Sequence, residues 1–193
     1  MTSLFKTVAP SLLAITWVSC QTAATSPSDN KVVAVPDLGF RYTPPPGMMD
    51  KTSASSQEAR SHAAAYTGKR FDLLLDLSSD EDDASAAWHQ VWIFNLPRAT
   101  WPALSDAAAT AKMNSLAAGA KATAIGPPQS AVISGRNFVA SEFELNEPPL
   151  VKHAKIFTTN CKGQLVAFVF VSNSAAKISA MEESLKTLDF SKP

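Results

Sequence analysis

The pattern of hydrophobic positions predicts two strands in the first half of the chain. In one stretch, apolar residues alternate with Asp72, Leu74 and Asp76, which is typical of a half-buried strand. Its inward positions are Phe71, Leu73, Leu75 and Leu77. The other stretch, Trp88–Leu96, is apolar on both faces. Because a strand is apolar on both sides when both are covered, this one is predicted to lie inside the sheet.

Two hairpins are predicted further along the chain. The stronger one joins two strands through a tight turn, with the segments Val151–Thr159, Asn160–Gly163 and Leu165–Ser172. The second of these strands is apolar along most of its length, as expected of a central strand. The other hairpin pairs Ala131–Ser134 with Asn137–Leu145 around Gly135. Nearer the start, Val32–Tyr42 is predicted to be extended, with an interruption at Pro36-Asp37.

Helical signals occur between these strands. The clearest helix is predicted over Thr100–Ala118, with Thr100 as its N-cap, Pro102 in its first turn and Gly119 at its end. Its predicted buried face is formed by Leu104, Ala108 and Ala111. An Ala- and Ser-rich stretch, Ser53–Tyr66, predicts a short helix as well.

A second amphipathic helix is predicted near the C-terminus, with Ser174 as its cap. Its apolar stripe is formed by Ile178, Met181, Leu185 and Leu188, after which Phe190 packs on an apolar surface. The order of elements is strands, helix, strands, hairpin, helix. Consecutive strands without crossover helices predict an α+β fold, an antiparallel sheet flanked by helices in an α-β-α sandwich.

The first residues are typical of a secretory signal peptide. A short polar start with Lys6 precedes the uncharged stretch Thr7–Val18, which is too short for a bilayer that needs about 20 helical residues. Val18-Ser19-Cys20 is similar to the end of a bacterial lipobox, which makes Cys20 a lipidation candidate and residues 1–20 the signal. An ordinary cleavage site at Thr22-Ala23-Ala24 is the alternative.

The mature chain is predicted to be a tethered single domain. Residues 21–31 are rich in Ser, Thr, Ala, Pro and Asp, which is typical of a flexible tether, and residues 32–193 form the globular part. The protein is therefore expected to be exported, either to the periplasm or to the membrane-anchored cell envelope.

The charge balance and the number of cysteines exclude several classes of protein. The 193 residues include 17 Lys+Arg and 17 Asp+Glu, and the charged fraction is 18%. Cleavage at either site removes Lys6 and no acidic residue, so the net charge falls from zero to −1. Such a balance excludes a strongly basic nucleic-acid binder. Two cysteines are too few for a disulfide scaffold or an all-cysteine zinc site, which needs four.

Two segments give the chain a resemblance to the PsbP-like superfamily, which includes PsbP, DcrB-type bacterial lipoproteins and secretion accessory proteins. The first is Gly39-Phe40-Arg41-Tyr42-Thr43-Pro44, and the second is the closing run Ser184–Phe190 after the strand Leu165–Ser172. The chain departs from the family at Met48-Met49, where a Trp is frequent. The resemblance implies an α-β-α sandwich and non-catalytic binding or assembly roles, with no shared catalytic residues.

Three groups of residues are candidates for chemistry, each with a plainer interpretation. The acidic run Asp80–Asp83 lacks the glycine and distal glutamate of a calcium loop, so a solvated loop is favoured. Cys161 with His153 as its base would make a small thiol hydrolase, but no oxyanion-hole signature accompanies them. Aromatic residues at strand spacing usually form core, so a ligand-binding surface lined by tryptophans is a lesser alternative; the tryptophans are Trp88, Trp92 and Trp101.

The sequence therefore predicts a non-catalytic binding or accessory protein of the cell envelope with a protein partner. No catalytic residue or cofactor is expected, because the sequence shows no catalytic constellation. No metal ligand is expected either, because neither His62 nor His89 has a partner at metal-ligand spacing. The alternatives are the thiol hydrolase built on Cys161 and His153, and a small-ligand module with an apolar pocket beside Trp92 or Phe94.

Overall fold

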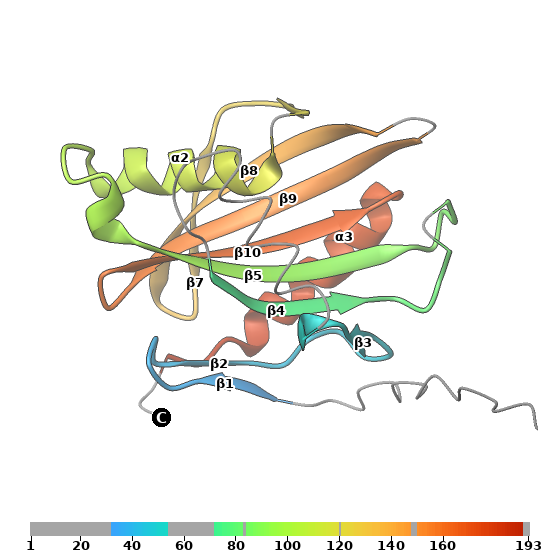
Figure 1. Cartoon of the computed structure of the whole chain (residues 1–193), viewed down its shortest axis with the longest axis horizontal. Helices are drawn as coiled ribbons and strands as arrows, with labels where there is room; N and C mark the ends of the chain where they lie inside the picture. Colours follow the sequence, from blue (N-terminus) through green and yellow to red (C-terminus); the bar gives the residue numbers. More distant parts are fainter. Residues whose placement is uncertain (1–31, 54–71, 83, 120, 148–149, 191–193) are drawn as a thin grey trace, which may run out of the picture.

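The computed structural model describes residues 32–53, 72–82, 84–119, 121–147 and 150–190. The signal peptide, Cys20, the tether, His62 and most of the predicted helix Ser53–Tyr66 lie outside these residues. Within them an antiparallel sheet of eight strands carries two α-helices (Figure 1). No helix of the described residues is long and apolar enough to cross a membrane.

The large sheet has the strand order β3-β4-β5-β10-β9-β8-β6, and β7 also pairs with β8. A separate two-stranded sheet is formed by β1 and β2. The bounds of the strands are Val33–Val35 (β1), Phe40–Tyr42 (β2), Met49–Asp50 (β3), Asp72–Ser78 (β4), His89–Pro97 (β5), Ala122–Ala124 (β6), Gln129–Ile133 (β7), Arg136–Glu147 (β8), Leu150–Cys161 (β9) and Gln164–Ser172 (β10).

Both predicted hairpins are confirmed. β9 and β10 are joined by Lys162-Gly163, and β7 and β8 by Ser134-Gly135. Each pair of turn residues has positive φ, 49° and 78° in the first turn and 49° and 74° in the second. Two-residue turns of this kind match the twist of the flanking strands, which explains why a glycine occupies the second position in both.

Strand β10 forms the middle of the sheet, as its apolar sequence predicts. It pairs with β5 on one side and β9 on the other, and alternate side chains enter two separate cores. The core under helix α3 (Ala175–Glu182), here called the α3-side core, receives Val166, Phe168 and Phe170. The core under helix α2 (Asp106–Ala118), here called the α2-side core, receives Leu165, Ala167, Val169 and Val171. The prediction of an antiparallel sheet with helices packed on it is confirmed.

The α3-side core is closed by both ends of the described chain. Helix α3 (Ala175–Glu182) continues into the 3₁₀ helix η2 (Glu183–Thr187), and the predicted stripe of Ile178, Met181, Leu185 and Leu188 is buried there. Strand β2 packs beside them, and Tyr42 shares a hydrogen bond of 2.7 Å with the Ser184 hydroxyl. The Phe190 ring packs on those of Phe40 and Phe138, which confirms its predicted apolar contact.

Helix α2 (Asp106–Ala118) covers the other core and corrects the predicted helix start. Its N-cap is Ser105, whose side chain accepts a hydrogen bond from the Ala108 N–H at 3.2 Å, so the predicted cap at Thr100 is wrong. Thr100 instead ends a 3₁₀ turn, η1 (Arg98–Thr100). The predicted stop at Gly119 is confirmed, with a φ of 88°.

The buried face of α2 is also different from the predicted one. Ala108 is exposed, whereas the fully buried residues of the helix are Ala109, Thr110, Met113 and Asn114. Asn114 explains why hydrophobicity alone misplaced this face. It donates to the Val139 carbonyl at 2.9 Å and to the Ser141 hydroxyl at 2.8 Å, and it accepts from the Thr158 hydroxyl at 2.5 Å. A polar residue with every partner satisfied is thus part of this core.

Candidate binding surface

The predicted catalytic pair Cys161 and His153 is not assembled. Both residues lie on β9, where His153 is paired with Ser172 and Cys161 with Gln164 at the opposite end of β10. Eight steps of roughly 3.4 Å along a strand separate them by about 27 Å. The expectation that the two side chains are near each other is wrong, because Cys161 ends a strand rather than lying within a turn.

Cys161 is also in the wrong environment for a nucleophile. Its side chain is fully buried in the α3-side core, and Arg136 Nη1 donates a hydrogen bond to its Sγ at 3.9 Å. Burial raises the pKa of the Cys161 thiol, and the Arg136 and Lys162 charges lower it by less. A thiol held in its neutral form is a poor nucleophile, so Cys161 serves as a small apolar core residue.

The acidic run forms part of the loop between β4 and β5. The carboxylate of Asp82 accepts a hydrogen bond from the Ala84 N–H at 2.8 Å, and that of Glu81 accepts one from the Ser85 hydroxyl at 3.4 Å. Nearby, the His89 ring is 2.8 Å from the Ala87 carbonyl. Across the described residues, no group of three His, Cys, Asp or Glu is placed to hold a metal ion.

Of the three tryptophans that the sequence singled out, one is a core residue and the other two lie at the edge of a core. Trp88 is buried, with the Lys152 ammonium 4.4 Å from its ring centroid. Trp92 and Trp101 are half-buried and pack against the α2-side core together with Phe94. The Trp92 and Phe94 rings lie on the same face of β5 with centroids 6.2 Å apart. Aromatic residues that keep part of their surface exposed are typical of binding surfaces.

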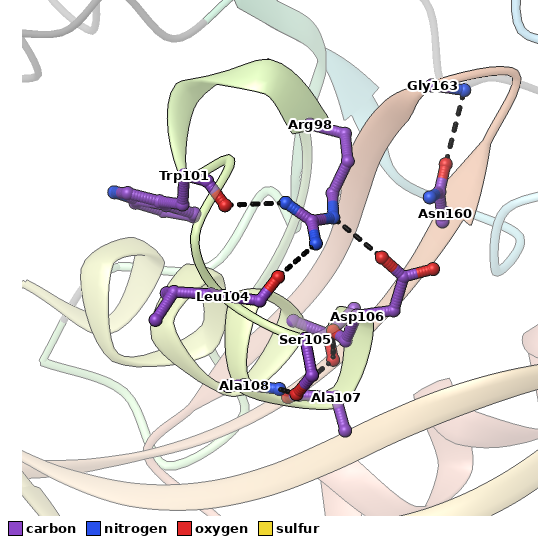
Figure 2. A network of polar contacts seen from close by, with 10 residues as sticks. Arg98, Trp101, Leu104, Ser105, Asp106, Ala107, Ala108, Asn160 and Gly163 are labelled. Atoms are coloured by element: carbon purple, nitrogen blue, oxygen red, sulfur yellow. Dashed lines mark hydrogen bonds and ion pairs between the residues drawn. The ribbon is translucent and has the colours of Figure 1, made fainter.

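Trp101 lies on a short loop that a single arginine holds in shape. Arg98 donates from Nη1 to the Trp101 carbonyl at 2.7 Å and from Nη2 to the Leu104 carbonyl at 2.5 Å (Figure 2). Its Nε donates to the Asp106 carboxylate at 2.7 Å. One planar guanidinium thus joins η1, the loop and the first turn of α2, which the point charge of a lysine would not do.

The same network reaches the β9–β10 turn. The Arg98 N–H donates to the Gly163 carbonyl at 2.9 Å, and the Gly163 N–H donates to the Asn160 side chain at 3.2 Å. The hydrogen bond from Arg98 lowers the pKa of the exposed Asp106 carboxyl, and its Coulombic attraction and a hydrogen bond from Asn160 act in the same direction. The negative charge of Asp106 at the first turn of α2 also suits the helix dipole.

The ring of Trp101 projects away from the Arg98 guanidinium (Figure 2). Lys112, one turn and a half into α2, places its ammonium 5.9 Å from the Trp101 ring centroid. We refer to Trp101, Leu104, Lys112, Trp92 and Phe94 as the aromatic surface, because all the apolar members border the α2-side core. Chemically, such a surface binds apolar and aromatic side chains and tolerates an acidic group near Lys112.

Arg98, Asp106 and Asn160 were not found from the sequence. A signal for part of the network is present, because Ser105-Asp106 is a good helix start with an acid in the first turn. The contacts of Arg98 to two backbone carbonyls carry no sequence signal, since any residue supplies a carbonyl.

No family model matches the sequence, and no curated protein matches it. Among solved structures, cyanobacterial PsbP from Synechocystis matches with a TM-score of 0.49 and 13% identity, over 88% of this chain and 95% of that chain. A mutant of the protein Mog1 matches with a TM-score of 0.51 and 10% identity, over 86% of this chain and 97% of that chain. The Ran-binding protein Mog1p of Saccharomyces cerevisiae matches with a TM-score of 0.45 and 10% identity, over 86% of this chain and 85% of that chain.

At these identities the likeness concerns the fold alone. A solved PsbP is among the structures that this chain resembles, as the sequence predicts. The match to the Mog1 mutant spans 86% of this chain and 97% of that chain, so the likeness in fold extends beyond a single motif.

Proposed function

We propose that this protein is a non-catalytic binding or accessory module that holds a protein partner through the aromatic surface. The observation that carries the proposal is the loop of Trp101, which Arg98 fixes with three hydrogen bonds while the ring points away from them. A partly exposed tryptophan on a fixed loop is a typical hot-spot residue of protein interfaces.

The physical reason is preorganisation. A loop that is already ordered loses little conformational entropy on binding, so more of the contact energy appears as affinity. Trp101, Trp92 and Phe94 supply rigid contact area, and Lys112 supplies a charge at its edge. The relatives in fold are in keeping with such a role: Mog1p of yeast is named as a Ran-binding protein, which is a statement about that protein.

We place the module outside the cytoplasm, as an exported protein of the cell envelope. The support is the signal-like stretch Thr7–Val18 and the lipobox-like Val18-Ser19-Cys20 that follows it. Two or more acyl chains on Cys20 would anchor the protein, at about 0.8 kcal/mol per buried methylene. The α-β-α sandwich is proposed as the finer description of the fold, supported by the placement of α2 and α3 in different cores.

Partner capture tests the binding role. The chain is crosslinked in envelope fractions as wild type, as Trp101→Ala and as Val151→Ala, the last changing an exposed valine of β9 outside the aromatic surface. We expect a specific partner with wild type and Val151→Ala, and at least a tenfold lower recovery with Trp101→Ala, because loss of a hot-spot residue costs about 2 kcal/mol or more. Equal recovery with all three proteins would refute the aromatic surface as the binding site.

Fatty-acid labelling tests the anchor. A Cys20→Ala chain is expected to incorporate no labelled fatty acid and to leave the membrane fraction, while a Cys161→Ala chain is labelled as the wild type is. Label that persists after the Cys20 change would exclude lipidation at this residue and favour cleavage after Ala24.

A further inference from the structure

Strand β7 is an open edge of the large sheet. Within the described residues it forms ladder hydrogen bonds with β8 only, so its second side carries unpaired backbone groups. Open edges of this kind accept a further strand, and most proteins protect them with charges, prolines or bulges.

The hairpin turn determines which groups of β7 point outward. Ser134-Gly135 is a two-residue turn, so the flanking pair Ile133 and Arg136 exchanges both hydrogen bonds. Bonded and non-bonded pairs then alternate along an antiparallel ladder. Ala131 therefore bonds to Phe138, whereas Ser130 and Val132 direct their N–H and carbonyl groups away from β8.

The five residues of the strand itself lack the usual protection, because the nearest prolines, Pro127 and Pro128, precede it. The sequence of β7 is Gln-Ser-Ala-Val-Ile, with neither a charged residue nor a proline between Gln129 and Ile133. Val132 has 72% of its surface exposed, more than any other large hydrophobic residue of the described chain. Its cross-strand neighbour Asn137 is uncharged as well. A neutral, β-branched and exposed edge is suited to pairing with another neutral strand.

We propose that β7 pairs antiparallel with β7 of a second copy of this chain, around a two-fold axis at Ala131. In this register Ser130 lies opposite Val132 of the partner copy, and each such pair exchanges two hydrogen bonds. The two Ala131 residues then face each other as a non-bonded pair, whose small side chains permit the close approach. The result is one continuous sheet with an isologous interface.

A second copy fits this edge because the strand is complementary to itself. Antiparallel pairing of two identical strands places like residues near one another, which is unfavourable for charged strands and neutral for this one. Arg136, the charged residue next to the turn, directs its guanidinium onto the Phe190 ring at 4.4 Å instead of toward the edge. Because only a short strand is paired, the dimer is expected to be weak and dependent on concentration.

Sedimentation of the full chain over a range of concentrations tests the dimer. The wild type is expected to approach twice its mass of 20.5 kDa as concentration rises. Val132→Lys is expected to raise the dissociation constant roughly tenfold or more, because the dimer would contain each new charge twice. Val151→Lys, which adds the same charge at another exposed valine, is expected to behave as the wild type.

Cysteine crosslinking tests the register. Ala131→Cys is expected to form a disulfide-linked dimer under mild oxidation, because non-bonded pairs have Cα atoms about 4.5 Å apart, within the range of a disulfide. Val132→Cys is expected to crosslink poorly, since the two copies of this residue are diagonal neighbours at roughly 7–8 Å or more. Both variants also carry Cys20→Ala, so that Cys20 cannot crosslink, and the buried Cys161 is unchanged.

A chain that remains monomeric at every concentration would overturn the proposal. Equal weakening by Val132→Lys and Val151→Lys would overturn it as well, because the effect would then come from net charge. If Val132→Lys lowered partner capture while the chain stayed monomeric, the edge would belong to a strand of another protein and not to a second copy. Trp101→Ala leaves the dimer unchanged in every case, which separates this inference from the proposed function.

Discussion

Asn114 is expected to be the most sensitive polar residue of the fold. It is fully buried in α2 and forms three hydrogen bonds that join the helix to β8 and β9, two as donor and one as acceptor from Thr158. Replacing it with alanine leaves the Thr158 hydroxyl without this acceptor and the Val139 carbonyl and Ser141 hydroxyl without this donor.

The magnitude follows from what is left unpaired. A buried polar group without a partner costs about 1–3 kcal/mol, and the groups around Asn114 are only partly able to find others. Alanine regains roughly 0.6 kcal/mol of helix propensity. We therefore expect Asn114→Ala to lower the free energy of unfolding by about 2–4 kcal/mol. With a typical urea dependence of about 2 kcal/mol per molar, the unfolding midpoint should fall by roughly 1–2 M.

Urea unfolding of five proteins tests this prediction: the wild type, Asn114→Ala, Thr158→Val, their double variant and Ser115→Ala. Ser115→Ala is the matched control, because Ser115 is exposed on the same helix and its loss should change stability by less than about 0.5 kcal/mol. The double variant Asn114→Ala, Thr158→Val should be less destabilised than the sum of its single changes by about 1 kcal/mol, since the unpaired hydroxyl is gone. A cost of Asn114→Ala close to that of Ser115→Ala, or strict additivity, would show that this network does not hold α2 on the sheet.

Three further predictions concern single side chains. Arg98→Lys should lower stability by about 1–2 kcal/mol, because a lysine cannot reach both carbonyls, and hydrogen exchange should quicken at Leu104 but not at Met113. The buried Cys161 thiol should react slowly with an alkylating reagent in the folded protein at pH 8 and quickly in urea. Cys161→Ser should complement a deletion strain. Fast alkylation of the folded protein would instead favour the thiol-hydrolase alternative. Burial raises the pKa of the Tyr42 hydroxyl above its usual range, and the hydrogen bond with Ser184 lowers this pKa by less. Above about pH 10 the hydroxyl therefore loses its proton in the unfolded chain but keeps it in the folded one. Stability should therefore fall with rising pH there, and Tyr42→Phe should lessen the fall; an unchanged pH profile would contradict this.

The sheet was predictable because its signals are local. The apolar run of β10 and the two glycine-containing turns each depend on residues close in sequence. The alternation in β4 found the strand but not its burial, because the predicted outward Asp76 is buried and the register shifts between Leu73 and Leu75. The stripe of α3 and η2 was predictable for the same reason. β6 was missed because Ala122-Thr123-Ala124 is short and has no large apolar residue to mark a face.

The errors arose where distant contacts decide the structure. Thr100-Trp101-Pro102 is a plausible helix start, but the Arg98 side chain stabilises a bent loop there and moves the start to Ser105. Cys161 was placed in a turn near His153, whereas pairing with Gln164 extends β9 through Cys161 and separates the two. The tryptophans of the aromatic surface were predicted from the sequence, but Arg98, which positions Trp101, was not.

The proposed β7–β7 dimer and the proposed partner contact through the aromatic surface together predict how two binding surfaces are arranged. A two-fold axis at Ala131 that runs perpendicular to a continuous sheet keeps the α2 sides of both copies on the same face, so both Trp101 loops point the same way. β1, which follows the tether in sequence, packs on the α3-side core, so a pair anchored through two lipids would present its aromatic surfaces away from the membrane. Two linked sites raise the apparent affinity for a partner array by about 10²–10⁴ when both engage. On a sensor densely coated with the captured partner, Val132→Lys should therefore dissociate much faster than the wild type, whereas the two should match on a sparsely coated sensor. Trp101→Ala should bind more weakly than the wild type on both. Equal dissociation of Val132→Lys and the wild type from the dense surface would show that the dimer does not present its two aromatic surfaces together.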